Sequence, residues 1–114
     1  MKKVYHLIDH ASLNRARETG EHSPASLTEE GFVHLAYREQ LTFVIKHFLA
    51  GQKGIWLLEL DKEKLKGELI DEAPAGIEDN GQLYPHLYAP LNISAMQRCW
   101  ELQITADGEC ELPV

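Results

Sequence analysis

The alternation of hydrophobic and polar residues at the start of the chain predicts a β-strand. Val4, His6 and Ile8 lie on one face of this segment, and Tyr5 and Leu7 lie on the other. Because strand side chains alternate between two faces, one of these faces can be buried. Further strands are predicted at residues 32–36, at 55–60, where a nearly continuous apolar run is typical of a buried central strand, at 70–72 and at 97–105.

Two helices are predicted in the first half of the chain. Asp9 can cap the first helix, which contains Leu13 and Ala16 and can end at Gly20. The second helix precedes Gly51 and has apolar residues at i, i+3, i+4, i+7 and i+8, a spacing that places them on one helix face. These apolar residues are Leu41, Val44, Ile45, Phe48 and Leu49.

The remaining segments are predicted to be irregular. Residues 21–30 form a polar loop, and residues 73–82 form a loop rich in Pro, Gly, Asp and Asn. Residues 83–91 contain two prolines and therefore cannot be a central strand throughout. A helical turn is predicted at 93–96, and the tail, 106–114, is expected to fray. Because strands outnumber helices without regular alternation, we expect a single α+β domain with a mostly antiparallel or mixed sheet.

The composition of the chain indicates a globular protein of one domain. The 114 residues suit one domain, and 44% hydrophobic and 25% charged residues are ordinary for a globular chain. The net charge of −7 argues against broad, charge-driven nucleic-acid binding. Cys99, expected in the core, and Cys110, in the tail, form no disulfide framework. Without a signal-like start or a membrane-length apolar run, we expect a cytoplasmic protein with no membrane contact.

Three of the six histidines lie where an imidazole needs partners. His6 and His34 lie inside predicted strands, and His86 lies in the proline-stiffened segment 85–88. Each of them, taken alone, fits a structural histidine whose ring nitrogens are hydrogen-bonded within the fold. Together they favour a shared polar cleft lined by His6, His34 and residues 85–88, since histidine suits acid–base work near neutral pH.

A metal site is not favoured by the spacing of these residues. The chain has no HxH or HExxH motif, and the change of pattern at Asp9 separates His6 from His10. His22 and His47 are predicted to lie at the surface. The chain also has no GxSxG, GxGxxG or GxxxxGK[ST] motif, so neither a hydrolase elbow, a Rossmann unit nor a P-loop is indicated.

Three charged residues have two interpretations each. Glu72, at a predicted strand end, could orient a ribose hydroxyl or steady a positive charge, or could simply be solvated. Arg38, which follows a predicted strand, could bind a phosphate or lie at the surface. Glu59 lies within an apolar run, so its environment is either unusual or open to solvent.

The chain contains several short sequence segments whose combination and order are specific for a protein family. They are Tyr5-His6-Leu7-Ile8, Ser26-Leu27, Glu30-Gly31-Phe32-Val33-His34-Leu35, Glu39-Gln40, Trp56-Leu57-Leu58-Glu59-Leu60-Asp61, Glu72 and Tyr84-Pro85-His86-Leu87-Tyr88-Ala89-Pro90-Leu91. In these segments the chain resembles the DUF952 family, over nearly its whole length. Family members often carry Ser and Gly where this chain has Ala36 and Ala89, so a possible ligand donor is missing at position 36.

The fold of that family resembles the fold of ADP-ribosyltransferases, in which a split, mostly antiparallel sheet holds NAD in a central cleft. The resemblance implies ADP-ribosyltransferase-like chemistry on NAD or a similar small nucleotide. We then expect His6, Arg38 and Tyr88 to bind the cofactor, and His34, Glu72 and His86 to contribute to catalysis. Two alternatives stay open, namely a non-catalytic module that binds a small ligand or a protein, and a metal-dependent hydrolase.

Overall fold

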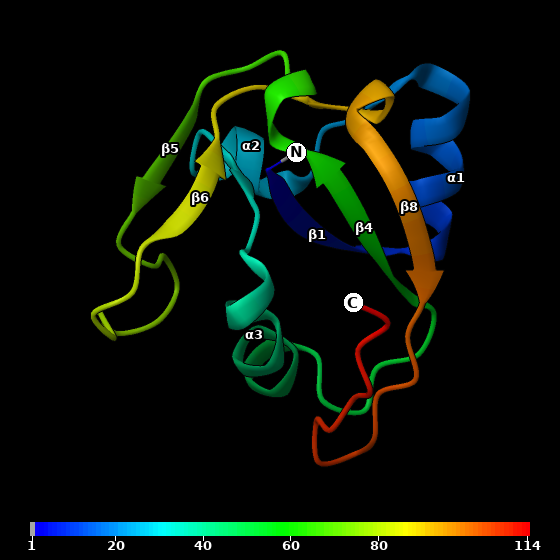
Figure 1. The fold of residues 1–114 in the computed structure, drawn as a ribbon, viewed down its shortest axis with the longest axis vertical. Helices are drawn as coiled ribbons and strands as arrows, with labels where there is room; N and C mark the ends of the chain where they lie inside the picture. Colours follow the sequence, from blue (N-terminus) through cyan, green and yellow to red (C-terminus); the bar gives the residue numbers. More distant parts are fainter. Residues whose placement is uncertain (1) are drawn as a thin grey trace.

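The computed structural model describes residues 2–114 and has the α+β architecture, with mostly antiparallel strands, that the sequence predicts. In chain order its elements are β1 (Lys3–Asp9), α1 (His10–Thr19), β2 (Glu21–His22), α2 (Ala25–Glu29), β3 (Val33–His34), the 3-10 turn η1 (Arg38–Gln40), α3 (Leu41–Phe48), β4 (Ile55–Asp61), η2 (Lys62–Lys64), β5 (Leu69–Glu72), β6 (Tyr84–Leu87), β7 (Leu91–Asn92), η3 (Ile93–Ala95) and β8 (Met96–Glu101). Figure 1 shows their arrangement.

The strands form two three-stranded sheets and one short ribbon. One sheet has the order β1-β4-β8, the other has the order β3-β6-β5, and β2 pairs with β7. Figure 1 shows β5 and β6 to one side of β1, β4 and β8. An isolated antiparallel bridge between Tyr5 and Ala36, with backbone hydrogen bonds of 2.8 and 2.9 Å, connects the two larger sheets. The sheet is therefore split, and β1 lies at the division.

Strands β1 and β4 of the β1-β4-β8 sheet contribute buried residues on both faces. Val4, Ile8 and Leu58 belong to a core cluster on one face, whereas Tyr5 and Leu57 belong to a second cluster on the other. Adjacent residues of β1 and β4 enter different clusters because strand side chains alternate. This arrangement explains the nearly continuous apolar run of β4.

The two predicted helices form where the pattern places them. The Asp9 side chain accepts a 3.0 Å hydrogen bond from the Ser12 amide and so caps α1. Gly20, with a φ of 90°, ends α1 by donating to the Ala16 carbonyl. In α3, Leu41 and Ile45 are fully buried, but Phe48 of the predicted apolar face is 46% exposed.

The predicted loop over residues 21–30 instead contains β2 and a third helix, α2. Glu21 and His22 pair with Asn92 and Leu91, so this segment is anchored to β7. Pro24 then occupies the N-cap of α2, where its missing N–H costs no helical hydrogen bond. The sequence showed the polar composition of this segment but not its distant pairing partner.

The C-terminal segment also differs from the prediction. β8 ends at Glu101 rather than at residue 105, and the tail packs instead of fraying. Cys110, Leu112 and Val114 pack against the core cluster that contains Leu41 of α3 and Leu57 of β4. Alternate apolar residues in the tail provide the hydrophobic area that holds it in place.

Pro85 lies in the middle strand of its sheet, although residues 83–91 as a whole do not form a strand. The Pro85 carbonyl accepts a 3.0 Å hydrogen bond from the Leu35 amide. Because proline has no N–H, Pro85 cannot return this bond, and the β3–β6 ladder covers only Val33 and His34. β6 ends at Leu87, before Pro90.

Glu59 is a buried charged residue of the core, with an exposed fraction of 1%. Its carboxylate accepts hydrogen bonds of 3.0 and 3.1 Å from Arg98 and one of 3.1 Å from the Tyr5 hydroxyl, and the Lys3 ammonium lies 3.5 Å away. Burial acts to raise the pKa of Glu59, but the hydrogen bonds from Arg98 and Tyr5 outweigh it and hold this pKa below its usual value. Glu59 therefore has the unusual environment, not the solvated one.

The helices of the described part of the chain are all short. Within residues 2–114, none combines the length and the apolar character that crossing a membrane requires.

Candidate ligand pocket

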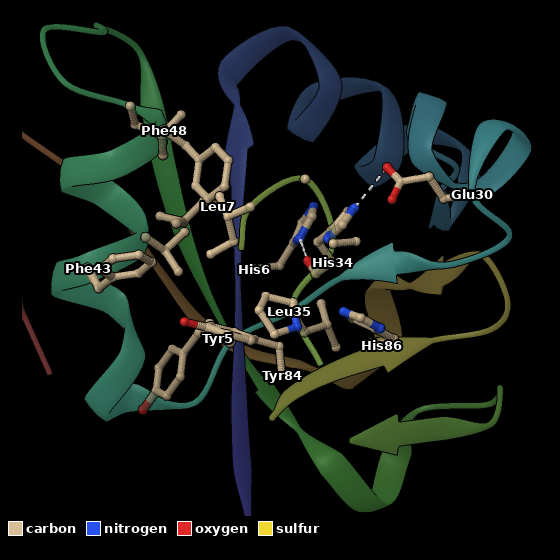
Figure 2. A pocket seen from close by; sticks show the side chains of 17 residues that line it. Tyr5, His6, Leu7, Glu30, His34, Leu35, Phe43, Phe48, Tyr84 and His86 are labelled. Atoms are coloured by element: carbon tan, nitrogen blue, oxygen red, sulfur yellow. Dashed lines mark hydrogen bonds and ion pairs between the residues drawn. The ribbon is translucent and has the colours of Figure 1, made fainter. Parts of the chain in front are cut away.

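A pocket of about 360 Å³ lies beside β1, where the two larger sheets divide (Figure 2). Its floor comes from β1 and from the segment that follows β3, one wall comes from α3, and part of the rim comes from residues 74–77. The residues that line it are Tyr5, His6, Leu7, Glu30, His34, Leu35, Ala36, Phe43, Val44, Phe48, Leu49, Pro74, Ala75, Gly76, Ile77, Tyr84 and His86. The structure therefore brings His6, His34 and His86 to one pocket, as the sequence predicted.

His6 provides a buried, neutral imidazole. Its Nδ1 lies 2.8 Å from the carbonyl oxygen of His34. Because a carbonyl can only accept, Nδ1 must carry the hydrogen, and Nε2 of the neutral ring is an acceptor. Burial lowers the pKa of His6 to about 4, against a smaller raising effect of the His34 hydrogen bond. His6 is thus uncharged at neutral pH.

His34 and Glu30 form a hydrogen-bonded pair at the more open part of the pocket. His34 Nε2 lies 3.1 Å from a carboxylate oxygen of Glu30, and both side chains are partly exposed. Figure 2 shows this pair beside the ring of His6. The polar end of the pocket therefore holds one carboxylate as well as the imidazoles, and Glu30 was not among the site residues that the sequence predicted.

His86 is almost completely enclosed, with 3% of its side chain exposed. Its Nδ1 lies 3.0 Å from a carboxylate oxygen of Glu72, which also accepts a hydrogen bond from the Tyr88 hydroxyl. The ring packs against Phe32, with ring centroids 4.0 Å apart, and meets the His34 ring edge-on at 5.5 Å. Nε2 of His86 is buried and has no hydrogen-bond partner among residues 2–114.

Glu72 is held as a carboxylate by its two partners. The hydrogen bond from Tyr88, and then that from His86, lower the pKa of Glu72 below its usual value. The same contact with Glu72, together with burial, raises the pKa of Tyr88. Glu72 therefore stays charged at neutral pH and presents a strong acceptor to His86 Nδ1.

The rest of the pocket is mostly apolar, in contrast to the polar cleft that the sequence suggested. Phe43 and Phe48 of α3 are 42% and 46% exposed, and they line the pocket rather than the core. Val44 and Leu49 continue this wall, with Ile77 from the loop. No Lys or Arg is among the lining residues. The helical spacing within residues 41–49 predicted one apolar helix face. It could not distinguish residues that line the pocket, such as Phe48, from residues of the core.

Three predicted site residues do not line the pocket. Arg38 is exposed on η1, and its guanidinium donates to the carbonyl of Val114. Glu72 and Tyr88 lie behind His86, and Tyr88 is 38% exposed. The structure thus places Glu72 and Tyr88 in a position to act through His86, and it gives Arg38 a contact with the tail instead of a place in the pocket.

The remaining histidines differ from one another. His47 is exposed, as predicted, and its ring lies between Phe43 and Phe48 with centroid distances of 5.4 and 4.8 Å. His22, also predicted at the surface, is half-buried, with its ring 5.5 Å from that of His6, and burial lowers its pKa. The pairing of β2 with β7 places it there. Among residues 2–114, no three His, Cys, Asp or Glu side chains are arranged to hold a metal ion.

Comparison with known proteins identifies a family and solved relatives without a described activity. The family model described as "Protein of unknown function (DUF952)" matches residues 7–99. The chain is similar to a crystal structure of protein CC0527 from Caulobacter crescentus, with 31% identity, coverage of 96% of this chain and 94% of that one, and a TM-score of 0.83. A solution structure of CC0527 covers 95% and 90% at 31% identity, with a TM-score of 0.75. No curated protein matches the sequence.

Proposed function

This chain belongs to the DUF952 family of proteins of unknown function, and we propose that it has a fold like that of ADP-ribosyltransferases and that its pocket binds NAD or an ADP-ribose-like nucleotide. The observation that carries this proposal is the convergence of His6, His34 and His86, from three separate strands, on one pocket of about 360 Å³. Convergent polar side chains in an otherwise apolar pocket are typical of small-molecule sites. The split sheet, with the pocket at its division, supports an ADP-ribosyltransferase-like fold.

The pocket suits the nicotinamide–ribose end of NAD better than the diphosphate. Its volume lies near the lower end of the range for small-molecule sites, so it has room for about one ring and one sugar. Phe43 and Phe48 offer aromatic surface to a flat ring. Since no Lys or Arg lines the pocket, a diphosphate would lack the cationic donors that usually bind it. We therefore place the diphosphate outside the pocket.

ADP-ribosyltransferase-like chemistry at this site would break the bond between ribose C1′ and the nicotinamide nitrogen. Nicotinamide leaves with the bonding electron pair, the acceptor's nucleophilic atom forms the new bond to C1′, and the proton of the acceptor passes to solvent water. The Glu30 carboxylate lines the pocket and can stabilise positive charge that develops on the ribose. Glu72 lies behind His86, so it can influence this charge only through the imidazole.

Titration calorimetry with NAD, nicotinamide riboside and ADP-ribose tests the proposal. We expect NAD and nicotinamide riboside to bind, and ADP-ribose, which lacks the nicotinamide, to bind more weakly than NAD. Release of free nicotinamide during incubation with NAD would show catalysis. The absence of binding at millimolar NAD would overturn the proposal.

A non-catalytic binding module is the second candidate, and the apolar character of the pocket favours it. Aliphatic and aromatic side chains of α3 and the 74–77 loop dominate the walls, a composition that suits retention of a neutral ligand. In this case a ligand would raise the unfolding temperature without turnover. NAD that stabilises the protein but remains intact after prolonged incubation would support this second function.

A further inference from the structure

The buried nitrogen of His86 indicates what kind of group the pocket recognises. Nδ1 and Nε2 lie on nearly opposite sides of an imidazole, and Nδ1 is directed at Glu72. Nε2 therefore faces away from Glu72, and in Figure 2 the ring extends from β6 towards Leu35 and His34 inside the pocket. A buried polar atom without a partner costs free energy unless a ligand or water satisfies it.

The contact with Glu72 decides whether Nε2 donates or accepts. A carboxylate has only acceptor oxygens, so the 3.0 Å contact requires hydrogen on Nδ1. In the neutral ring Nε2 then carries the lone pair. Glu72 is kept charged by Tyr88 and His86, which makes this tautomer the stable one, as carboxylates do for metal-bound histidines.

His6 reaches the same state by a different contact. Its Nδ1 donates to the carbonyl of His34, which leaves Nε2 as an acceptor. At the polar end of the pocket these two imidazole acceptors accompany the Glu30 carboxylate, which is hydrogen-bonded to His34, and no Lys or Arg lines the pocket. The arrangement favours ligands that bring hydrogen-bond donors and disfavours those that bring carboxylates or phosphates.

We propose that His86, held in its Nδ1–H tautomer by Glu72, is the acceptor through which the pocket recognises an N–H or O–H donor of its ligand. Glu72 is then a positioning residue, because it touches His86 and not the ligand. This role of His86 rests on the proposed function, in which the pocket is a ligand site, and it specifies how the ligand is recognised there. For NAD, the donors available at this end are the carboxamide N–H groups and the ribose hydroxyls.

The first test reads the tautomer directly in the free protein. Long-range proton–nitrogen NMR spectra of histidine-labelled protein distinguish a protonated ring nitrogen from an unprotonated one. At pH 7.5 we expect His86 Nδ1 to be protonated and Nε2 to be unprotonated. Glu72→Leu is expected to shift His86 towards the Nε2–H tautomer, whereas Glu72→Gln, which keeps an acceptor oxygen, should preserve Nδ1–H. A protonated Nε2 in the neutral wild-type ring would overturn the assignment.

The second test measures the donor requirement with two matched probes. Nicotinamide and 3-acetylpyridine have similar shape, but only nicotinamide has N–H donors. We expect nicotinamide to bind about 10-fold more tightly to the wild type, since the other probe leaves a buried acceptor unpaired. This preference should be lost in Glu72→Leu and retained in Glu72→Gln. Equal binding of the two probes, or no binding of nicotinamide, would overturn the donor requirement.

The two proposals can fail separately. If NAD binds but the pocket does not distinguish nicotinamide from 3-acetylpyridine, the role of His86 is wrong and the proposed function stands. If the tautomer and the nicotinamide preference are as expected but NAD does not bind, the proposed nucleotide is wrong and the donor-recognising pocket stands.

Discussion

The imidazole of His6 donates a 2.8 Å hydrogen bond from Nδ1 to the carbonyl oxygen of His34, and this bond spans the division between the two larger sheets. Beside the backbone bridge of Tyr5 and Ala36, it fixes β1 against the segment that contains β3. The same bond sets the His6 tautomer and turns its Nε2 into an acceptor. One contact therefore contributes both to the fold and to the chemical character of the pocket.

The burial of His6 predicts a specific loss of stability in acid. The unfolded chain protonates this histidine near pH 6.5, whereas the folded protein resists protonation until the pKa of about 4 is reached. Between these values the unfolded state binds more protons, so the free energy of unfolding falls as the pH falls. The loss amounts to roughly 3 kcal/mol across this window.

Comparison of the wild type with His6→Asn isolates this contribution, because the Asn amide can replace the Nδ1–H donor but does not titrate. Urea unfolding at pH 7 and pH 4 should show a wild-type decrease about 3 kcal/mol larger than that of the variant. Any contribution of His22 is present in both proteins. Parallel pH profiles would show that His6 is not the group responsible.

A close backbone approach predicts a coupled pair of substitutions at Gly67 and Ala89. A Cβ atom at Gly67 would lie 2.3 Å from the Cβ of Ala89, much closer than carbon atoms can pack. Gly67→Ala should therefore lower the free energy of unfolding by about 1–3 kcal/mol. Adding Ala89→Gly removes the clash, so the double variant should recover most of this loss. A double-mutant cycle that shows simple additivity would contradict the predicted contact.

The buried carboxylate of Glu59 predicts a loss of stability on substitution. Glu59→Gln replaces an acceptor-only group with one that includes N–H donors facing Arg98 and the Tyr5 hydroxyl. We expect a loss of about 1–3 kcal/mol in the free energy of unfolding, measured with urea. Glu101→Gln, at an exposed position of β8, is the matched control and should change it by less than about 0.5 kcal/mol. Equal effects of the two substitutions would disprove the special environment of Glu59.

The wall of the pocket predicts a binding defect on substitution. Val44 lines the pocket from α3, whereas Thr42 of the same helix is exposed and does not line it. Val44→Trp should fill part of the pocket and weaken NAD binding at least 10-fold, with Thr42→Trp leaving it unchanged. Calorimetric titration measures both. If Thr42→Trp weakens binding as much as Val44→Trp, the ligand does not occupy this pocket.

Most of the regular elements could be predicted because their signals are local. The alternation of Val4, His6 and Ile8 on β1 and the Asp9 and Gly20 caps of α1 depend on neighbouring residues alone. The segments that were predicted wrongly depend on distant partners. β2 forms because Glu21 and His22 pair with β7. The tail packs because its apolar side chains contact the core cluster that contains Leu41 of α3.

The site shows the same division between local and distant information. His6 and His34 within apolar strands, and His86 in a proline-stiffened segment, were expected to need partners. The structure brings all three to one pocket. Sequence could not show which residues form its walls, since Val44 and Phe48 have the same helical spacing whether they face the core or a cavity. Nor could it show that Arg38 donates to Val114 of the tail instead of lining the pocket.

The most direct test of the account follows the histidine side chains by NMR while NAD is added to the free protein. We expect the ring signals of His6, His34 and His86 to shift together, with one common dissociation constant, while the signal of the exposed His10 of α1 stays unchanged. Unmoved signals for these three residues at saturating or millimolar NAD would contradict the central claim that they form a single nucleotide pocket.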